Sequence, residues 1–169
     1  MAITRLGGAN AISGTLPAAN INATSLGNVD VGKVLQVVYA EDTGLVSSTS
    51  TTYADTGLSG TITPSSTSSK ILIHVTLADL QKVVADTYLR CRTLRDGSSI
   101  FTFVGQAGYT GSTASNNAGS VTAHYLDSPA STSALIYKTQ FHNASGGGTV
   151  YITPDGNSRS TMILMEIAG

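Results

Sequence analysis

The stretch from Ser50 to Leu77 limits what this chain can fold into more than any other segment. It contains two runs of strand-forming residues, Tyr53–Thr63 and Lys70–Leu77, with a Ser/Thr-rich turn between them. In the second run every other residue is apolar, and in an extended strand such residues share one face. The residues on that face are Ile71, Ile73, Val75 and Leu77. The spacing predicts two strands, the second of which buries one face in a core.

Further strand patterns follow at short, nearly regular intervals. We expect strands at Val34–Tyr39, Thr87–Arg95, Ile100–Phe103, Val121–Leu126, Ser133–His142, Thr149–Thr153 and Thr161–Ala168. Asp96-Gly97 predicts a hairpin turn. The spacing of apolar residues from Leu77 to Val84 also fits a short helix, but we interpret that segment as an irregular connection. Many short strands without a long helix predict an all-β, antiparallel β-sandwich or barrel.

The balance of charge excludes several classes of partner. Only 11% of the residues are charged and the net charge is −1, so we expect no binding to nucleic acid or to an anionic membrane through bulk electrostatics. A chain that is 41% hydrophobic with so few charges is expected to cover part of its apolar surface with copies of itself. Neither a signal peptide nor an apolar run of about 20 residues is recognisable. We therefore expect a soluble protein, made in a cytoplasm, without membrane insertion.

Residues 1–32 differ from the rest and are predicted to form an extended arm. They are rich in Gly, Ala, Asn and Thr, and their apolar residues follow neither the strand nor the helix period. Such a segment does not fold alone, and is either disordered or laid along another surface. Residues 33–169 are predicted to form the single β domain.

No group of residues predicts catalysis, a cofactor or a metal. The histidines His74, His124 and His142 all fall within predicted strands, and none has a second ligand at a usual metal-binding spacing. A metal site would have to be assembled from distant strands or neighbouring chains, and we expect none. Cys91 is the only cysteine, which excludes an intrachain disulfide. Serine nucleophile motifs and a supported carboxylate pair are also missing, so we expect a protein that is not an enzyme.

The glycine-rich loop Gly105–Gly119 is the strongest candidate for binding. It holds Tyr109, Asn116 and Asn117 among small residues, and long loops on a rigid β scaffold commonly carry recognition. Tyrosine offers a flat face and a hydroxyl group, and asparagine offers paired donors and acceptors. Packing of this loop within an oligomer is the alternative, and the sequence leaves both open. Arg90 and Arg92 share a strand face and fit either an anionic glycan or a solvated surface.

The run Thr161–Ile167 predicts a central strand. Nearly every residue is apolar, as expected when one face packs in the core and the other against a neighbouring chain or loop. Glu166 interrupts the run, because an unpaired buried carboxylate is costly. We expect it to reach solvent at the strand end or to pair with a cation; the candidates are Lys33, Arg90, Arg92 and Arg159.

Three segments resemble parts of bacteriophage fibres. The stretch Ser50–Val75 and the closing strand Thr161–Ile167 resemble the head domains of short phage fibre and tail proteins, and Ile3–Pro17 resembles the leader of many phage fibres. The resemblance implies a jelly-roll β-sandwich, a homotrimer, and a place on the virion. It also implies that the arm anchors the protein to other virion proteins. The anchoring residues would be Ile3, Leu6, Ile12 and Leu16.

A fibre head of this kind would contact the host surface through its distal loops. Tyr109, Asn116 and Asn117 would then bind a host cell-surface glycan or a protein partner. The rival function is a tail-associated enzyme that degrades polysaccharide. That function would require a carboxylate pair in a groove and a longer chain of repeated β-coils. A secreted jelly-roll module of the complement or cytokine type is a third reading, and it should carry a signal peptide.

Overall fold

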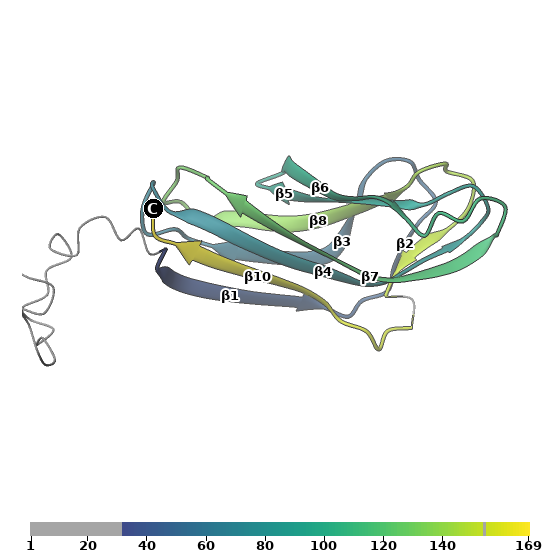
Figure 1. Ribbon diagram of the computed structural model, residues 1–169, viewed down its shortest axis with the longest axis horizontal. Helices are drawn as coiled ribbons and strands as arrows, with labels where there is room; N and C mark the ends of the chain where they lie inside the picture. Colours follow the sequence, from purple (N-terminus) through teal and green to yellow (C-terminus); the bar gives the residue numbers. More distant parts are fainter. Residues whose placement is uncertain (1–31, 154) are drawn as a thin grey trace, which may run out of the picture. The chain divides into compact units, whose positions relative to one another are not determined.

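All the regular structure in the described part of the chain is β-strand (Figure 1). The computed structural model describes residues 32–153 and 155–169. The strands are β1 (Val34–Asp42), β2 (Val46–Ser48), β3 (Ala54–Ile62), β4 (Lys70–Val83), β5 (Leu89–Arg95), β6 (Ser98–Ala107), β7 (Ser115–Asp127), β8 (Leu135–Asn143), β9 (Val150–Ile152) and β10 (Ser160–Ile167). These residues contain no helix that is long and apolar enough to cross a membrane.

The strands form two antiparallel sheets that pack as a β-sandwich. In the six-stranded sheet, called sheet A here, β4 lies between β10 and β7, and β1 forms the edge beyond β10. The short strands β9 and β2 continue this sheet beside the far end of β4. The four-stranded sheet, called sheet B, has the order β3-β8-β5-β6. The sequence therefore predicted the all-β, antiparallel class correctly.

The core lies between the two sheets and is made by the alternation that the sequence displays. Every second residue of β4, including Ile71, Ile73 and Val75, is fully buried. Sheet B contributes large side chains from its middle strands, among them Tyr137 and Phe141. Burying such side chains is worth about 1.5–3 kcal/mol each, which makes this layer the main source of stability in a chain without disulfides.

The interpretation of Leu77 to Val84 as an irregular connection was wrong, because β4 continues to Val83. Leu77 pairs with Val121 and Leu80 pairs with Gly119, so two residues of β4 face only one residue of β7. This is a β-bulge, in which the extra residue bends the strand. Asp79 occupies it with a φ of 48°. The bulge shifts the apolar residues out of strict alternation, and the resulting spacing imitates a helix.

The turns follow the sequence in part. Asp96 and Gly97 join β5 to β6 with φ values of 49° and 84°, as the predicted hairpin turn requires. The loop expected at Gly105–Gly119 is shorter than predicted. Strand β6 extends to Ala107 and β7 begins at Ser115, which leaves only residues 108–114 as a connection. The three-residue strand β2 was not anticipated.

Strand β10 is central, as predicted, because it lies between β1 and β4. The expectation for Glu166 was wrong in both of its forms. The side chain is buried and has no cationic partner among the residues that the structure describes. Its carboxylate instead accepts hydrogen bonds from the Ser65 amide at 2.7 Å, the Ser65 hydroxyl at 2.6 Å, the Ser69 hydroxyl at 2.7 Å and the Gln36 amide at 2.6 Å.

The environment of Glu166 favours the ionised carboxylate. Burial raises the pKa of Glu166, but the hydrogen bonds donated by Ser65, Gln36 and Ser69 outweigh it and lower the pKa to about 2. Neutral hydrogen-bond donors thus stabilise the Glu166 carboxylate, a role that was expected of a lysine or an arginine. They come from β1 and from the turn between β3 and β4, so Glu166 ties both segments to the last strand.

Candidate interaction surfaces

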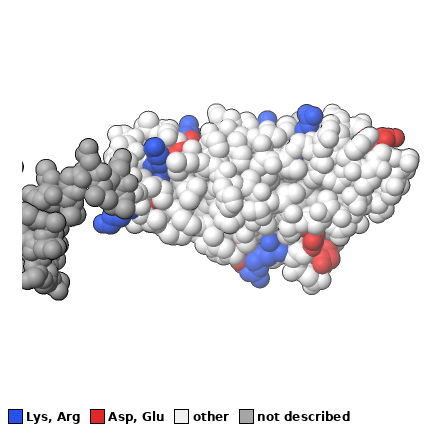
Figure 2. Space-filling view, viewed as in Figure 1, with Lys and Arg blue, Asp and Glu red and all other residues white. Residues whose placement is uncertain are grey.

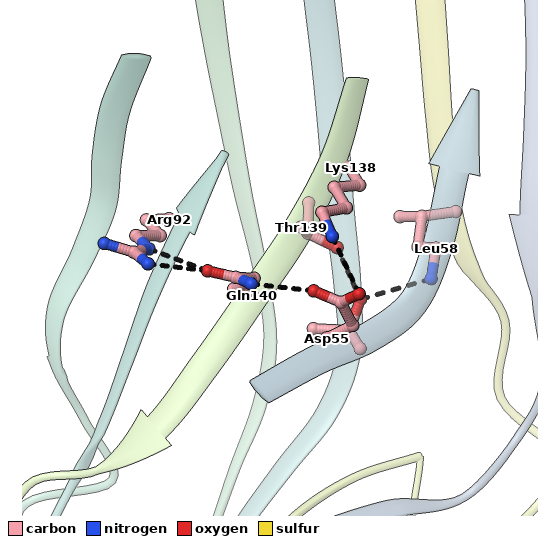
Figure 3. Close-up of polar contacts among 7 residues, drawn as sticks. Asp55, Leu58, Arg92, Lys138, Thr139 and Gln140 are labelled. Carbon is pink, nitrogen blue, oxygen red and sulfur yellow. Dashed lines mark hydrogen bonds and ion pairs between the residues drawn. The ribbon is translucent and has the colours of Figure 1, made fainter. Parts of the chain in front are cut away.

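A connected polar network crosses the outer face of sheet B (Figure 3). The Arg92 guanidinium donates to Gln140 Oε1 at 2.7 and 3.0 Å, and Gln140 Nε2 donates to Asp55 Oδ1 at 2.7 Å. Lys138 Nζ donates to the other Asp55 oxygen at 2.9 Å. The hydrogen bonds from Lys138 and Gln140 hold the pKa of Asp55 below its usual range. The network spans β5, β8 and β3 because their side chains alternate and these positions point away from the core.

Tyr53 lies at one end of this network. The Arg92 guanidinium stacks over the Tyr53 ring, 3.7 Å from the ring centroid. On another side His142 meets the same ring edge to face at 4.4 Å. A guanidinium at this distance attracts the negative face of the ring and fixes both planes.

Arg90, two residues before Arg92 on β5, continues the same face towards the loop at residues 108–114. Arg90 lies 5.6 Å from the Tyr88 ring centroid and donates to the Tyr88 hydroxyl at 3.3 Å. Tyr88 in turn packs edge to face against Tyr109, with ring centroids 5.9 Å apart. Below the loop, the buried Lys82 donates to the Thr113 carbonyl at 2.9 Å and holds the loop on β4.

These residues together form one surface, called the tyrosine–arginine surface below: Tyr53, Tyr88, Arg90, Arg92 and Tyr109. It presents flat aromatic rings beside fixed cationic donors. Rings of this kind stack on the apolar face of a sugar, and guanidinium groups bind carboxylate or sulfate groups in two-pronged fashion. Of the residues predicted for binding, only Tyr109 belongs to it. Alternation in the sequence puts Arg90 and Arg92 on one strand face, but it contains no signal that connects them with Tyr109.

The other two predicted binding residues have contacts within the protein. Asn116 lies in β7 and donates its side-chain amide to the Gly108 carbonyl at 3.2 Å. The Asn117 side-chain oxygen accepts from the Gly119 amide at 3.1 Å, where Gly119 has a φ of 70°. Both side chains therefore shape the backbone around the tyrosine–arginine surface.

The outer face of sheet A has the opposite character. Two neighbouring rows of residues cross it from β1 to β7 without any Asp, Glu, Lys or Arg. The rows are Val37, Met165, Leu72 and Leu126, and next to them Tyr39, Ile163, His74 and His124. Val37 is 58% exposed, Tyr39 55% and Leu126 49%. Figure 2 shows charged side chains towards the margins of this view and none across its middle.

Charged groups appear only at the borders of these rows. Lys70 pairs with Ile167 in the ladder at one end. At the other end Glu41 forms an ion pair with Arg159 and accepts a hydrogen bond from Tyr39 at 2.7 Å. An uncharged, partly apolar sheet face with a charged rim has the make-up of a protein interface.

Chemistry beyond binding finds little support in the described residues. They contain no cluster of three or more His, Cys, Asp or Glu side chains that could hold a metal. The buried Asp127 accepts from Arg95 at 2.6 Å and from the Tyr137 hydroxyl at 2.7 Å, so it links the two sheets. The predicted anchoring residues Ile3, Leu6, Ile12 and Leu16 lie outside the described residues.

No protein-family model matches this chain, and no curated protein matches it either.

Proposed function

We propose that this chain is a structural virion protein, the head of a short phage fibre that assembles as a homotrimer. Its first 32 residues anchor it to other virion proteins, and its tyrosine–arginine surface contacts a host cell-surface glycan. The observation that carries the proposal is the uncharged outer face of sheet A. A monomer that exposes Val37 and Tyr39 on β1 and Leu126 on β7 leaves apolar surface in water at a cost of roughly 25 cal/mol per Å².

The occupant of this face is a further copy of the same chain. The chain has few charges with which to keep a large apolar face soluble, and a closed ring of copies covers the face without open-ended growth. The long side chains of the outer face of sheet A lie in straight rows across β1, β10, β4 and β7. This arrangement suits packing against sheet A of another copy.

The strand order supports the jelly-roll type. When the short strands β2 and β9 are set aside, the remaining eight strands lie in the orders β1-β10-β4-β7 and β3-β8-β5-β6. This order arises when two Greek keys wrap around each other, with the first and last strands adjacent. Viral structural proteins use this arrangement often, so the topology agrees with the proposed role while leaving it to be tested.

Glycan contact is proposed at the tyrosine–arginine surface because it combines the exposed Tyr109 ring and two half-buried tyrosine rings with cationic groups. Three weak sites in one trimer, and several trimers on a particle, raise the avidity without tight binding at any single site. An enzyme that degrades polysaccharide is less well supported. Hydrogen bonds from Lys138 and Gln140 lower the pKa of Asp55 beside this surface, so its carboxyl group stays ionised and is a poor proton donor.

The experiment that tests the proposal is localisation on intact particles. Antibodies raised against the purified chain are applied to particles of the phage that encodes it, and gold labels are located by electron microscopy. We expect labels at a fixed site at the ends of short fibres. Particles without label, while the protein is abundant in the lysate, would overturn the proposed function.

A further inference from the structure

His74 and His124 face each other on the outer surface of sheet A. They are directly opposed in the antiparallel ladder between β4 and β7. Their ring centroids are 4.4 Å apart and their planes meet at 68°. His124 is exposed and His74 half-buried, so solvent reaches the pair from the open side of the sheet.

The spacing of the rings suits a shared metal ion. Bonds from a metal to histidine nitrogen are about 2.0–2.1 Å long, so two imidazoles held by one metal at roughly a right angle have centroids about 4.5 Å apart. At a tetrahedral angle the centroids lie about 5 Å apart. The observed separation of 4.4 Å is close to the first value. The rings meet edge to face, so both side chains must rotate for one nitrogen of each ring to reach a shared ion.

Neighbouring side chains leave the imidazole nitrogens of His74 and His124 available to bind a metal. In the next row of the same two strands, Thr76 and Thr122 satisfy each other through a hydrogen bond of 2.9 Å. Beyond His74 in the ladder stands the apolar Ile163. Neither His74 nor His124 has a hydrogen-bond partner among the described residues, whereas the buried His142 contacts the Asn143 carbonyl at 3.1 Å.

We propose that His74 and His124 form a two-histidine chelate for a borderline divalent transition metal of the Zn²⁺, Ni²⁺ and Cu²⁺ class. Imidazole nitrogen is a preferred ligand of these ions, and two ligands held rigidly on adjacent strands bind one ion better than two separate histidines do. No cluster of three or more ligand side chains occurs in the described residues. The bound metal therefore keeps open positions for water or for a donor group from another molecule. The chelate itself needs only the two rings of one chain. His74 and His124 lie in one of the two rows that the proposed assembly covers, so in a trimer the further donor would come from a neighbouring copy, whereas in a separate chain water fills the open positions.

The test titrates Ni²⁺ into the full-length protein without a histidine tag, followed by calorimetry, for the natural chain and for His74→Gln and His124→Gln. We expect one saturable Ni²⁺ site per chain, and a loss of affinity of at least about tenfold in each single variant, because a chelate needs both rings. Thr122→Ala, which changes the neighbouring row and keeps both histidines, serves as the matched control and should bind Ni²⁺ like the natural chain.

Two results would overturn the chelate. One is the absence of saturable Ni²⁺ binding by the natural chain. The other is a single variant that keeps the natural affinity or retains half of the sites, because independent histidines would behave in that way. Melting curves accompany each titration. If His74→Gln unfolds the half-buried position, His124→Gln decides the question alone, since its ring is exposed.

Discussion

At the scale of single residues, Glu166 shows how a charge is kept inside this sandwich by neutral donors, with no counter-ion in the described part of the chain. The carboxylate is buried on the central strand β10 and is held by Ser65, Ser69 and Gln36. Hydrogen bonds to an ionised group are worth about 1.5–3 kcal/mol each, and donors left without their acceptor are costly. The Ser/Thr-rich turn before β4 is therefore tied to the last strand through Ser65 and Ser69, although most of its residues are exposed.

We expect the stability of the domain to fall in acid because of Glu166. Its pKa is about 2 in the folded protein against 4.5 as the ordinary value, so the unfolded chain takes up the proton first as the pH drops. The stabilisation is complete above about pH 4.5 and is lost progressively towards pH 2. Urea unfolding at a series of pH values measures this loss.

Glu166→Gln provides the comparison. It should lower the stability at pH 7 by about 1–3 kcal/mol, because a neutral amide accepts these hydrogen bonds less well and brings donors of its own. It should also flatten the dependence on pH between 4.5 and 2. An equally steep acid dependence in Glu166→Gln would assign the effect to other carboxylates.

Tyr109 and Asn117 were both predicted to bind but are expected to respond differently to replacement. Tyr109 is 52% exposed and belongs to the tyrosine–arginine surface, so Tyr109→Ala should weaken adsorption to host cells by about 1–2 kcal/mol and leave the melting temperature unchanged. Asn117→Ala removes the hydrogen bond to Gly119 and should cost about 0.5–1.5 kcal/mol of stability with adsorption retained. Adsorption assays beside melting curves separate the two. Full adsorption by Tyr109→Ala would remove this residue from the binding surface.

At the scale of strands and turns, the sequence predicted most of the fold because most strands carry their own alternation. Ile71, Ile73 and Val75 mark the buried face of β4 without reference to any other segment. The prediction failed after Leu77, where the bulge at Asp79 depends on how β4 pairs with β7. A local pattern contains no information about that pairing.

The same limit explains why the sequence did not predict the candidate sites. His74 and His124 are distant in sequence, and only the ladder between β4 and β7 brings them together. The tyrosine–arginine surface likewise needs Tyr53 from the segment before β3 to meet Arg92 on β5. Alternation placed His74 and Arg92 on the faces opposite the apolar ones, but the neighbour across the sheet is set by strand order, which the sequence pattern left open.

Removing β10 should abolish folding. A chain that ends at Thr161 loses the strand between β1 and β4, and with it the fully buried Met162 and Leu164. Each buried side chain accounts for roughly 2–5 kcal/mol, and the exposed edges of β1 and β4 invite aggregation. We expect insoluble protein on expression. A chain that starts at Gly32 retains every described strand and is the matched control, which should remain soluble. A soluble chain without β10 would show that β10 is peripheral to the fold.

At the scale of the whole domain, the two outer faces have different proposed roles: sheet B contacts a glycan and sheet A forms the contact between copies. Sheet B presents charged and aromatic groups that are linked to one another, as in the path from Arg92 through Gln140 to Asp55. Sheet A presents two uncharged rows with ions only at the border. Assembly through sheet A would leave the tyrosine–arginine surface of every copy directed outward, since the two faces lie on opposite sides of the sandwich.

Assembly through sheet A predicts that a charge placed on its rows separates the copies. Leu126 and Ile136 allow a matched comparison, because both are 49% exposed and lie on different sheets. Leu126→Asp would place a carboxylate in the contact between copies, where an unpaired charge costs several kcal/mol. Ile136→Asp makes the same chemical change on sheet B. Light scattering at micromolar concentration should give a trimer for the natural chain and for Ile136→Asp, and a folded monomer for Leu126→Asp. A natural chain that is monomeric, or a Leu126→Asp trimer as stable as the natural one, would exclude this face as the site of assembly.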